Sequence, residues 1–394
     1  MLRRDLSGAT PHGASHRRTV ILAAGAAVIL AGGTTAGLAA AHSGARHASP
    51  ARTHLISSAC GGPAGAAYVS DAGWDGFTAI DTATCDIIQT YNVGDRHVPG
   101  DAGGYDYDST NEGVAVHGST LYFADAGNST VAVIDTTKLD PKNYNPDEKL
   151  INVGLFPESL AVTPDGEQVW SADTGPQTSR SSPSGISVIS TASDKVVAKL
   201  PLSGTPSAVA FSPSGTRAYV ATSAGLWIYS TQTRQVLRVI RGLGEPRSVA
   251  VSPDGRTVYV TATDSGAVAV INAANNTVTR TIKVGELPWQ VIVSADGQTV
   301  YVANPDSNTV SVIDATTGTV SHTISVAGDP ETLALTPNGQ RLWVGQNSAG
   351  TVTVLNTATD AVVGDINLGG GEAQSGDGFD PAGIVLVTTP TPGS

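Results

Sequence analysis

The stretch RSVAVSPDGRTVYVTATDSGAVAVINAANNTVTRTIKVG runs from Arg247 to Gly285, and WQVIVSADGQTVYVANPDSNTVSVIDATTGTVSHTISVAG runs from Trp289 to Gly328. Both stretches have the same layout: four short runs rich in Val, Ile, Thr and Tyr, separated by turns such as Pro-Asp-Gly, Asn-Asn or Thr-Gly. Runs of this kind, separated by tight-turn residues, predict β-strands rather than helices. The chain therefore contains a repeated unit of four strands.

The repeat has a regular period along most of the chain. Its turn glycines are spaced 49, 40, 42 and 42 residues apart, at Gly166, Gly215, Gly255, Gly297 and Gly339. Counting the second run of each copy gives seven copies, and counting the third run gives the same number. Four antiparallel strands about every 42 residues are typical of β-propeller blades. We predict an all-β fold, a seven-bladed β-propeller with four antiparallel strands per blade.

The two ends of the repeat region complement each other. The first copy begins near Ala66 and lacks its innermost strand, whereas AGIVLVT at residues 382–388 reads as an innermost strand with nothing after it. Pairing the C-terminal strand with the N-terminal blade would close the ring and remove two open sheet edges. We therefore expect closure of this kind.

The repeats resemble the YVTN-type family of WD40-like β-propeller repeats, over residues 66 to 388 and best from Thr205 onward. That family is found in exported and surface proteins of bacteria and archaea. The resemblance implies an exported or surface propeller. It implies no catalytic residues, because family members include binding and surface-layer proteins, and related propellers serve as lyases, lactonases or electron-transfer scaffolds.

The first 59 residues have the pattern of a targeting segment and a linker rather than of a folded domain. A basic start precedes an apolar stretch from Val20 to Ala41, so residues 1–41 are predicted to be an export signal, with an uncleaved anchor as the alternative. The pair Arg17-Arg18 leaves both the general secretory and the twin-arginine routes open. Residues 42–59 are predicted to be a flexible linker and 60–394 the propeller. A secreted or cell-surface location follows.

The chain has two cysteines, Cys60 before the first strand and Cys85 in a turn of the same copy. Both positions fall on one rim of the first blade, so we predict a disulfide. Closing this loop would contribute about 3 kcal/mol in an oxidising compartment.

Charge and composition exclude several classes of protein. The formal net charge is −12, and only 14% of residues are charged. An acidic body repels phosphate backbones, so we expect no nucleic-acid partner. Two cysteines cannot form a zinc ribbon. We expect a monomer that meets a membrane only through its N-terminal segment, if that segment is uncleaved.

The corner that enters each innermost strand carries a Gly-x-x-Pro-like pattern, and the residue beside its proline varies. The variable positions chosen as candidate ligand-binding residues are Glu158, Arg247, Trp289, Glu331 and Asp380. Such residues at a channel mouth suit a ligand surface, with Trp289 as a stacking platform, Arg247 as an anion clamp and the carboxylates as acceptors. The alternative is that they only cap the channel or pair with each other.

Three long insertions, residues 94–112, 172–185 and 369–381, fall on the same rim and are rich in acidic residues, including Asp173. Long loops on one side of a rigid scaffold often carry function. The candidate ligands for Ca²⁺ are Asp101, Asp106, Asp108 and Glu112. A solvated acidic loop without metal remains the alternative.

Catalysis has one candidate residue, His97, because His117 and His322 fall on the other rim and in an outer strand. His97 could act as a general base. No Gly-x-Ser-x-Gly nucleophile motif occurs. Three functions stay open: a recognition module for a small molecule or an extracellular protein or glycan, a secreted lyase or lactonase-like hydrolase helped by a divalent cation, and a purely structural cell-wall protein.

Overall fold

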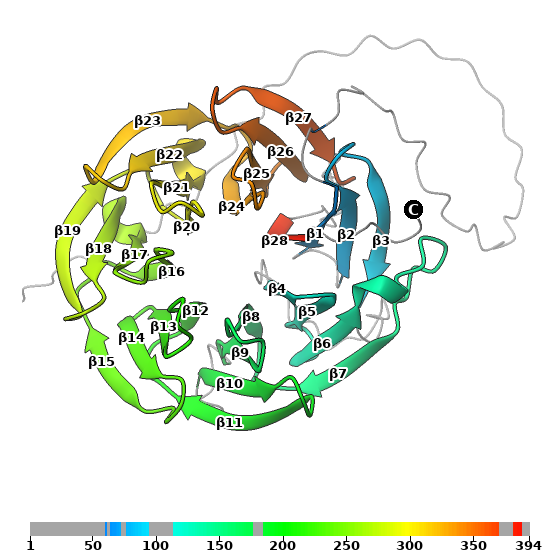
Figure 1. The fold of residues 1–394 in the computed structure, drawn as a ribbon, viewed down its shortest axis with the longest axis horizontal. Coiled ribbons are helices and arrows are strands. Elements are labelled where there is room, and N and C mark those ends of the chain that lie inside the picture. Colours follow the sequence, from blue (N-terminus) through cyan, green and yellow to red (C-terminus); the bar gives the residue numbers. More distant parts are fainter. Residues whose placement is uncertain are drawn as a thin grey trace, which may run out of the picture. The chain divides into compact units, whose positions relative to one another are not determined.

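The computed structural model describes residues 60, 64–71, 76–93, 113–175, 184–369 and 381–387. This part of the chain forms seven four-stranded antiparallel sheets arranged around a common axis, as Figure 1 shows. Three short 3-10 turns accompany the strands: η1 (Thr136–Lys138), η2 (Thr263–Ser265) and η3 (Pro305–Ser307). The predicted seven-bladed β-propeller is therefore confirmed. Across these described ranges, no helix has the length and apolar character needed to span a membrane.

Each blade contributes one strand to each of four concentric layers. The innermost strands are β28 (Pro381–Val387), β4 (Val114–His117), β8 (Pro157–Val162), β12 (Pro206–Phe211), β16 (Pro246–Val251), β20 (Val291–Val293) and β24 (Pro330–Leu335). The second strands are β1 (Ala66–Asp71), β5 (Thr120–Asp125), β9 (Gln168–Asp173), β13 (Arg217–Thr222), β17 (Thr257–Ala262), β21 (Thr299–Asn304) and β25 (Arg341–Gln346). The third strands are β2 (Gly76–Asp81), β6 (Thr130–Asp135), β10 (Gly185–Ser190), β14 (Gly225–Ser230), β18 (Ala267–Asn272), β22 (Thr309–Asp314) and β26 (Thr351–Asn356). The outermost strands are β3 (Ile87–Asn92), β7 (Glu148–Asn152), β11 (Lys195–Pro201), β15 (Val236–Ile240), β19 (Thr277–Lys283), β23 (Thr319–Ser325) and β27 (Val362–Asn367).

The ring closes by pairing strands from the two ends of the chain. The C-terminal β28 lies antiparallel to β1, with Ala67 opposite Leu386 and Val69 opposite Ile384. The sheet order is β28-β1-β2-β3, so the first blade takes its innermost strand from the end of the sequence. The predicted closure is confirmed, and it leaves β1 without an open edge.

The hydrophobic core lies between blades rather than within them. The described residues form seven buried apolar clusters, and each cluster takes its members from two neighbouring blades. For example, Tyr219 of β13 packs in the same cluster as Val260 of β17. A single blade therefore leaves its apolar faces exposed to water, and burial of these faces requires the neighbours. This arrangement makes the closed ring the stable unit.

The turns between innermost and second strands repeat one hydrogen-bonded pattern. In the blade that begins with β16, Ser252 Oγ donates to Asp254 Oδ1 at 2.6 Å, and the same oxygen accepts the Arg256 N–H at 3.0 Å. Gly255 adopts a φ of 69°, which suits glycine in a tight turn. Ser294 and Asp296 repeat the arrangement in the next blade. We name the end of the ring that carries these turns the turn rim.

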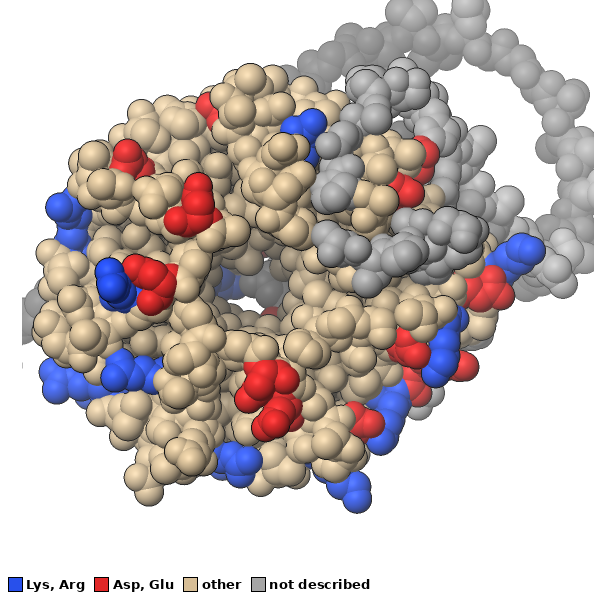
Figure 2. All heavy atoms as spheres, viewed as in Figure 1, with Lys and Arg blue, Asp and Glu red and all other residues tan. Residues whose placement is uncertain are grey.

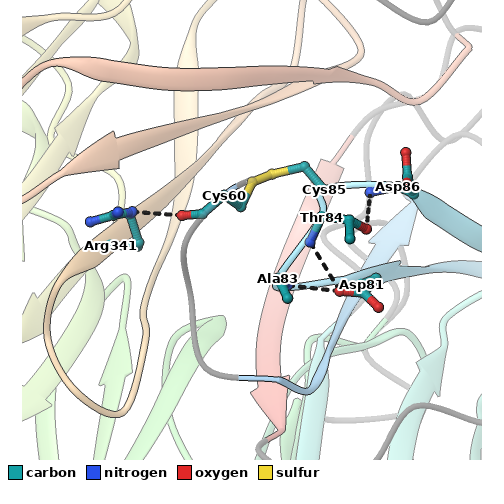
Figure 3. The surroundings of a disulfide bond; sticks show 7 residues. All are labelled: Cys60, Asp81, Ala83, Thr84, Cys85, Asp86 and Arg341. Atoms are coloured by element: carbon teal, nitrogen blue, oxygen red, sulfur yellow. Dashed lines mark hydrogen bonds between the residues drawn. A yellow bond between two sulfur atoms is a disulfide. The ribbon is translucent and has the colours of Figure 1, made fainter. Parts of the chain in front are cut away.

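The cysteines form the predicted disulfide, with the Cα atoms of Cys60 and Cys85 5.6 Å apart (Figure 3). Cys85 lies in the turn between β2 and β3, on the turn rim. The carbonyl oxygen of Cys60 also accepts a hydrogen bond from Nε of Arg341, at 2.7 Å. Arg341 begins β25 of the neighbouring blade. The chain therefore enters the ring tied to two blades at once.

Candidate ligand site at the channel mouth

The innermost strands of all seven blades enclose a cavity of about 480 Å³ along the axis of the ring. On the face shown in Figure 2, the ring is hollowed at its centre. Sites for small molecules commonly occupy about 300–1,000 Å³. The channel is therefore large enough to hold one small ligand.

A buried proline precedes each variable residue at the end of the channel opposite the turn rim. These prolines are Pro157, Pro206, Pro246, Pro288 and Pro330. A proline fixes the backbone angle φ and needs no hydrogen-bond acceptor, so it suits the first position of a strand. The next residue of each blade lines the cavity: Glu158, Ser207, Arg247, Trp289 and Glu331. We name this end of the cavity the channel mouth.

The structure thus brings together four of the five predicted ligand-binding residues. Glu158, Arg247, Trp289 and Glu331 line one cavity although they are separated by up to 173 residues of sequence. Asp380, the fifth, lies outside the described residues. The shared position within the repeat was the signal that identified them.

Other polar groups along the innermost strands connect adjacent blades. Ser207 Oγ donates at 3.3 Å to the carbonyl oxygen of Pro246, in the next blade. In the following pair, Ser248 Oγ accepts the Val291 N–H at 3.3 Å. These side chains have hydrogen-bond partners in the neighbouring blade, so we interpret them as structural links between blades.

Arg247 differs because its guanidinium has an aromatic partner and makes no hydrogen bond to the described residues. Its Cζ lies 3.2 Å from the centre of the Trp289 ring, a cation–π contact that covers one face of the indole. Within the described part of the chain, no carboxylate lies within the 4.0 Å ion-pair distance of this guanidinium. Its Nε is sealed from solvent and has no hydrogen-bond partner there. Arg247 is thus held in place by Trp289, and the described part of the chain supplies no acceptor for its donors.

This contact gives Trp289 a neighbour that the sequence did not predict. The sequence indicated a stacking platform for a ligand, whereas the structure places the Arg247 side chain on one face of the ring. Trp289 is fixed in turn by its backbone, whose N–H donates to the Ala303 carbonyl oxygen at 2.8 Å. The indole therefore orients the guanidinium.

Carboxylates surround Arg247 at longer range. Burial raises the pKa of Glu158 to about 7, and the opposing effect of Arg247 is smaller. Burial also lowers the pKa of Arg247, while Glu158, Glu331 and Glu245 each act to raise it. Two of these glutamates, Glu158 and Glu331, line the cavity with Arg247, and Glu245 acts on it from outside the lining. The channel mouth thus combines acidic surroundings with a donor group that has no ion-pair or hydrogen-bond partner among the described residues.

Thr332 adds a second uncommitted polar group that sequence reasoning missed. Residue Thr332 borders the cavity, but its side chain is 2% exposed, lies against Gly345, and carries a hydroxyl with no hydrogen-bond partner among the described residues. Thr is a common residue in strands, so nothing in the pattern distinguished it from its neighbours. A buried hydroxyl without a partner is unfavourable unless something else binds it.

Asp173, expected in an acidic loop, instead ends β9 and is buried. It accepts hydrogen bonds from Ser171 Oγ at 2.7 Å, Ser187 Oγ at 2.5 Å and the Gly154 N–H at 3.1 Å. Burial raises its pKa to about 6, against the lowering effect of these hydrogen bonds. With its oxygens satisfied by the protein, Asp173 holds strands together.

The remaining predicted residues lie outside the described residues. These are the candidate base His97 and the candidate calcium ligands Asp101, Asp106, Asp108 and Glu112. Both ideas stay predictions. In the described ranges, no group of three or more His, Cys, Asp or Glu side chains could hold a metal ion. His117 ends β4 toward the turn rim, and His322 in the outer strand β23 contacts Asp360 at 2.9 Å.

Comparison with known proteins identifies the family of the chain. The model of the choice-of-anchor I domain matches residues 76–291, more than half of the sequence. The chain belongs to the choice-of-anchor I domain family. No curated protein sequence matches this choice-of-anchor I domain protein.

Two solved structures show the same fold. A functionally unknown protein from Desulfotomaculum acetoxidans has a TM-score of 0.62 and 18% identity, covering 83% of this chain and 99% of its own. Kuenenia stuttgartiensis hydrazine synthase has a TM-score of 0.61 and 18% identity, covering 78% of this chain and 99% of its own. At this identity the similarity supports the fold of the choice-of-anchor I domain protein and nothing about its chemistry.

The family and the disulfide together point to an extracellular or surface protein. The choice-of-anchor I match fits a surface-type propeller. The Cys60–Cys85 disulfide agrees with it, because disulfides persist mainly in oxidising compartments. Both observations agree with the location expected from the repeats.

Proposed function

We propose that this propeller is an exported recognition module of the YVTN type, which binds a small ligand at the channel mouth. The observation that carries the proposal is Arg247, a half-buried guanidinium held against Trp289 with no hydrogen bond to any described residue. A half-buried charged group whose donors lack hydrogen-bond acceptors is unfavourable for stability. A protein retains such a group where a bound partner completes it.

The position of Arg247 supports recognition rather than a purely structural role. The corresponding residue of the preceding blade, Ser207, links its blade to the next through a hydrogen bond. A structural demand shared by all blades would place a similar residue at each position. Instead a serine, an arginine, a tryptophan and two glutamates share this ring of positions.

The test is retention of a small molecule by the immobilised full chain. Wild-type protein and the Arg247→Gln variant are exposed to small molecules from the medium of the producing cells, and the retained compounds are compared by mass spectrometry. We expect at least one compound that wild type retains and Arg247→Gln does not.

The matched control is Arg256→Gln. Arg256 lies in the same blade on the turn rim, with its side chain 86% exposed, and its loss removes the same charge. This variant should retain what wild type retains. Equal retention by wild type and Arg247→Gln would contradict the proposal.

One observation favours a second candidate, an acid–base enzyme of the lyase or hydrolase class. Glu158 lines the same cavity and has a pKa of about 7, close to the value that suits a general acid or base at neutral pH. Under this reading, Glu158→Gln would abolish turnover of the retained compound while the compound still binds. Retention without any product supports the recognition module.

A further inference from the structure

The charges at the channel mouth restrict the class of ligand that Arg247 can take. A guanidinium presents its N–H donors in a planar fork that fits carboxylate or phosphate oxygens. Arg247 presents this fork in a cavity of about 480 Å³, fixed by the Trp289 ring 3.2 Å away. The ligand therefore carries an oxyanion.

The acidic neighbours distinguish between kinds of oxyanion. Glu158, Glu331 and Glu245 act electrostatically on Arg247. Each carboxylate that stabilises the positive charge of the guanidinium also repels an incoming anion. This repulsion is about twice as large for a dianion as for a monoanion. The mouth therefore disfavours phosphate and sulfate esters relative to a carboxylate.

The same neighbours call for hydrogen-bond donors on the ligand. Ionised carboxylates only accept hydrogen bonds. Glu158 and Glu331 line the cavity, and Glu331 Oε2 also accepts a hydrogen bond from Asn347 Nδ2 at 3.5 Å. A ligand bound to Arg247 can donate hydrogen bonds to these carboxylates if it carries hydroxyl groups beside its own carboxylate.

Resting on the function proposed above, we infer that the channel mouth selects a hydroxylated monocarboxylate, such as a sugar acid, over both its uncharged and its phosphorylated counterparts. The carboxylate contacts Arg247, and the hydroxyl groups donate to the glutamates around it. The glutamates repel dianions more strongly than monoanions, and we name this selection by charge the filter.

Three probes with one sugar ring test this inference: glucuronate, glucose and glucose 6-phosphate. Binding of each to the full chain at pH 7.5 and low salt is measured by titration calorimetry, with ligand-detected NMR for weak binding. We expect glucuronate to bind at least tenfold more tightly than either other probe. We also expect Arg247→Gln to weaken glucuronate binding at least tenfold, and Arg256→Gln to leave it unchanged.

A second variant tests the filter itself. The double substitution Glu158→Gln, Glu331→Gln removes two negative charges and keeps the size of both side chains. It should improve glucose 6-phosphate binding at least threefold more than it improves glucuronate binding, because a dianion gains more from the loss of repulsion. Tm values of all variants establish that they are folded.

Several outcomes would overturn the inference. They are glucose 6-phosphate binding as tightly as glucuronate in wild type, glucuronate binding that is absent or indifferent to Arg247→Gln, and an unchanged preference in the double variant. The retention experiment separates this failure from that of the proposed function. An Arg247-dependent compound without a carboxylate would leave the recognition module standing and remove the monocarboxylate.

Discussion

The same innermost strands form both ends of the channel, yet the polar groups at the two ends differ in how many hydrogen-bond partners the protein provides. On the turn rim, Ser252 and Asp254 satisfy each other and the backbone, and Ser294 and Asp296 repeat the arrangement. At the channel mouth, the Arg247 guanidinium has no hydrogen bond to any described residue. The residues of these repeated, hydrogen-bonded turns stabilise the ring. Variation with unsatisfied donors is what the proposed function expects of residues kept for a ligand at a cost in stability.

The largest expected effect comes from removing the strand that holds both rims in one ring. Deleting residues 381–394 removes β28 and leaves β1 with an open edge. Four aliphatic side chains of β28, Ile384 to Val387, pack into the two adjoining clusters. At about 1.5–3 kcal/mol each, their loss approaches the whole stability of a typical domain. We expect the cooperative unfolding transition, followed by circular dichroism, to be lost.

Deletion of residues 389–394 alone is the control and should leave the transition in place. A truncation at residue 380 that melts as sharply and as late as the intact protein would show that the ring does not depend on closure.

The second effect concerns the turn rim alone. Replacing Cys60 and Cys85 together by serine removes the disulfide, which by loop-closure entropy contributes about 3 kcal/mol. We expect Tm to fall by roughly 5 °C, given the size of the domain. A reductant should lower the Tm of wild type by the same amount and leave that of the double variant unchanged. Two free thiols found by mass spectrometry in the oxidised protein would refute this prediction.

The third effect concerns the channel mouth and depends on pH. The pKa of Glu158 is raised from 4.5 in the unfolded chain to about 7 in the fold. The unfolded state therefore loses its proton first, and wild-type stability falls as pH rises from about 4.5 to 7. Glutamine has no proton to lose. Glu158→Gln should thus match wild type near pH 4.5 and exceed it above pH 7, by at most about 3 kcal/mol.

Urea unfolding at pH 4.5, 6 and 8 measures this difference. Glu286→Gln is the control, because Glu286 is exposed and lies in the loop that leads to Trp289. That variant should follow wild type at every pH. A Glu158→Gln variant that is less stable than wild type at pH 8 would indicate that the carboxylate stabilises the fold.

The smallest effect compares the two rims within one blade. Asp254 accepts two hydrogen bonds, which hold its pKa below the usual range, and Asp254→Ala should lower the unfolding free energy by about 1 kcal/mol. Arg247→Gln should leave the unfolding free energy unchanged or slightly higher, because it removes an unpaired charge. Urea midpoints of both variants test the contrast. A larger loss for Arg247→Gln would make the guanidinium structural.

The fold could be predicted well from the sequence because the four-strand pattern of a blade is repeated seven times. The period of the repeats gave the number of blades, and the missing strand before Ala66 gave the closure with residues 381–387. The two cysteines came together because their positions within a blade were known.

The candidate site was predictable only in part. The repeat register placed Glu158 and Arg247 at one mouth, since equivalent positions meet on a ring. It could not show that Arg247 lies on Trp289, because side-chain direction depends on packing that the repeat pattern does not encode. It also missed Thr332, whose unpartnered hydroxyl becomes visible only once its neighbours are placed. The repeat pattern does not predict the contacts of the residues that vary from one copy to the next.

The closure of the ring also sets the order in which the molecule can be completed. Ser70 of β1 donates to the carbonyl oxygen of Gly383, a partner 313 residues further along the chain. A growing polypeptide contains β1 and β2 early, yet their blade lacks its innermost strand until residues 381–387 have been synthesised. Until then β1 offers an unpaired edge to other chains. The blade whose second strand is synthesised first is therefore the blade completed last, and pairing with β28 is the step that covers this edge.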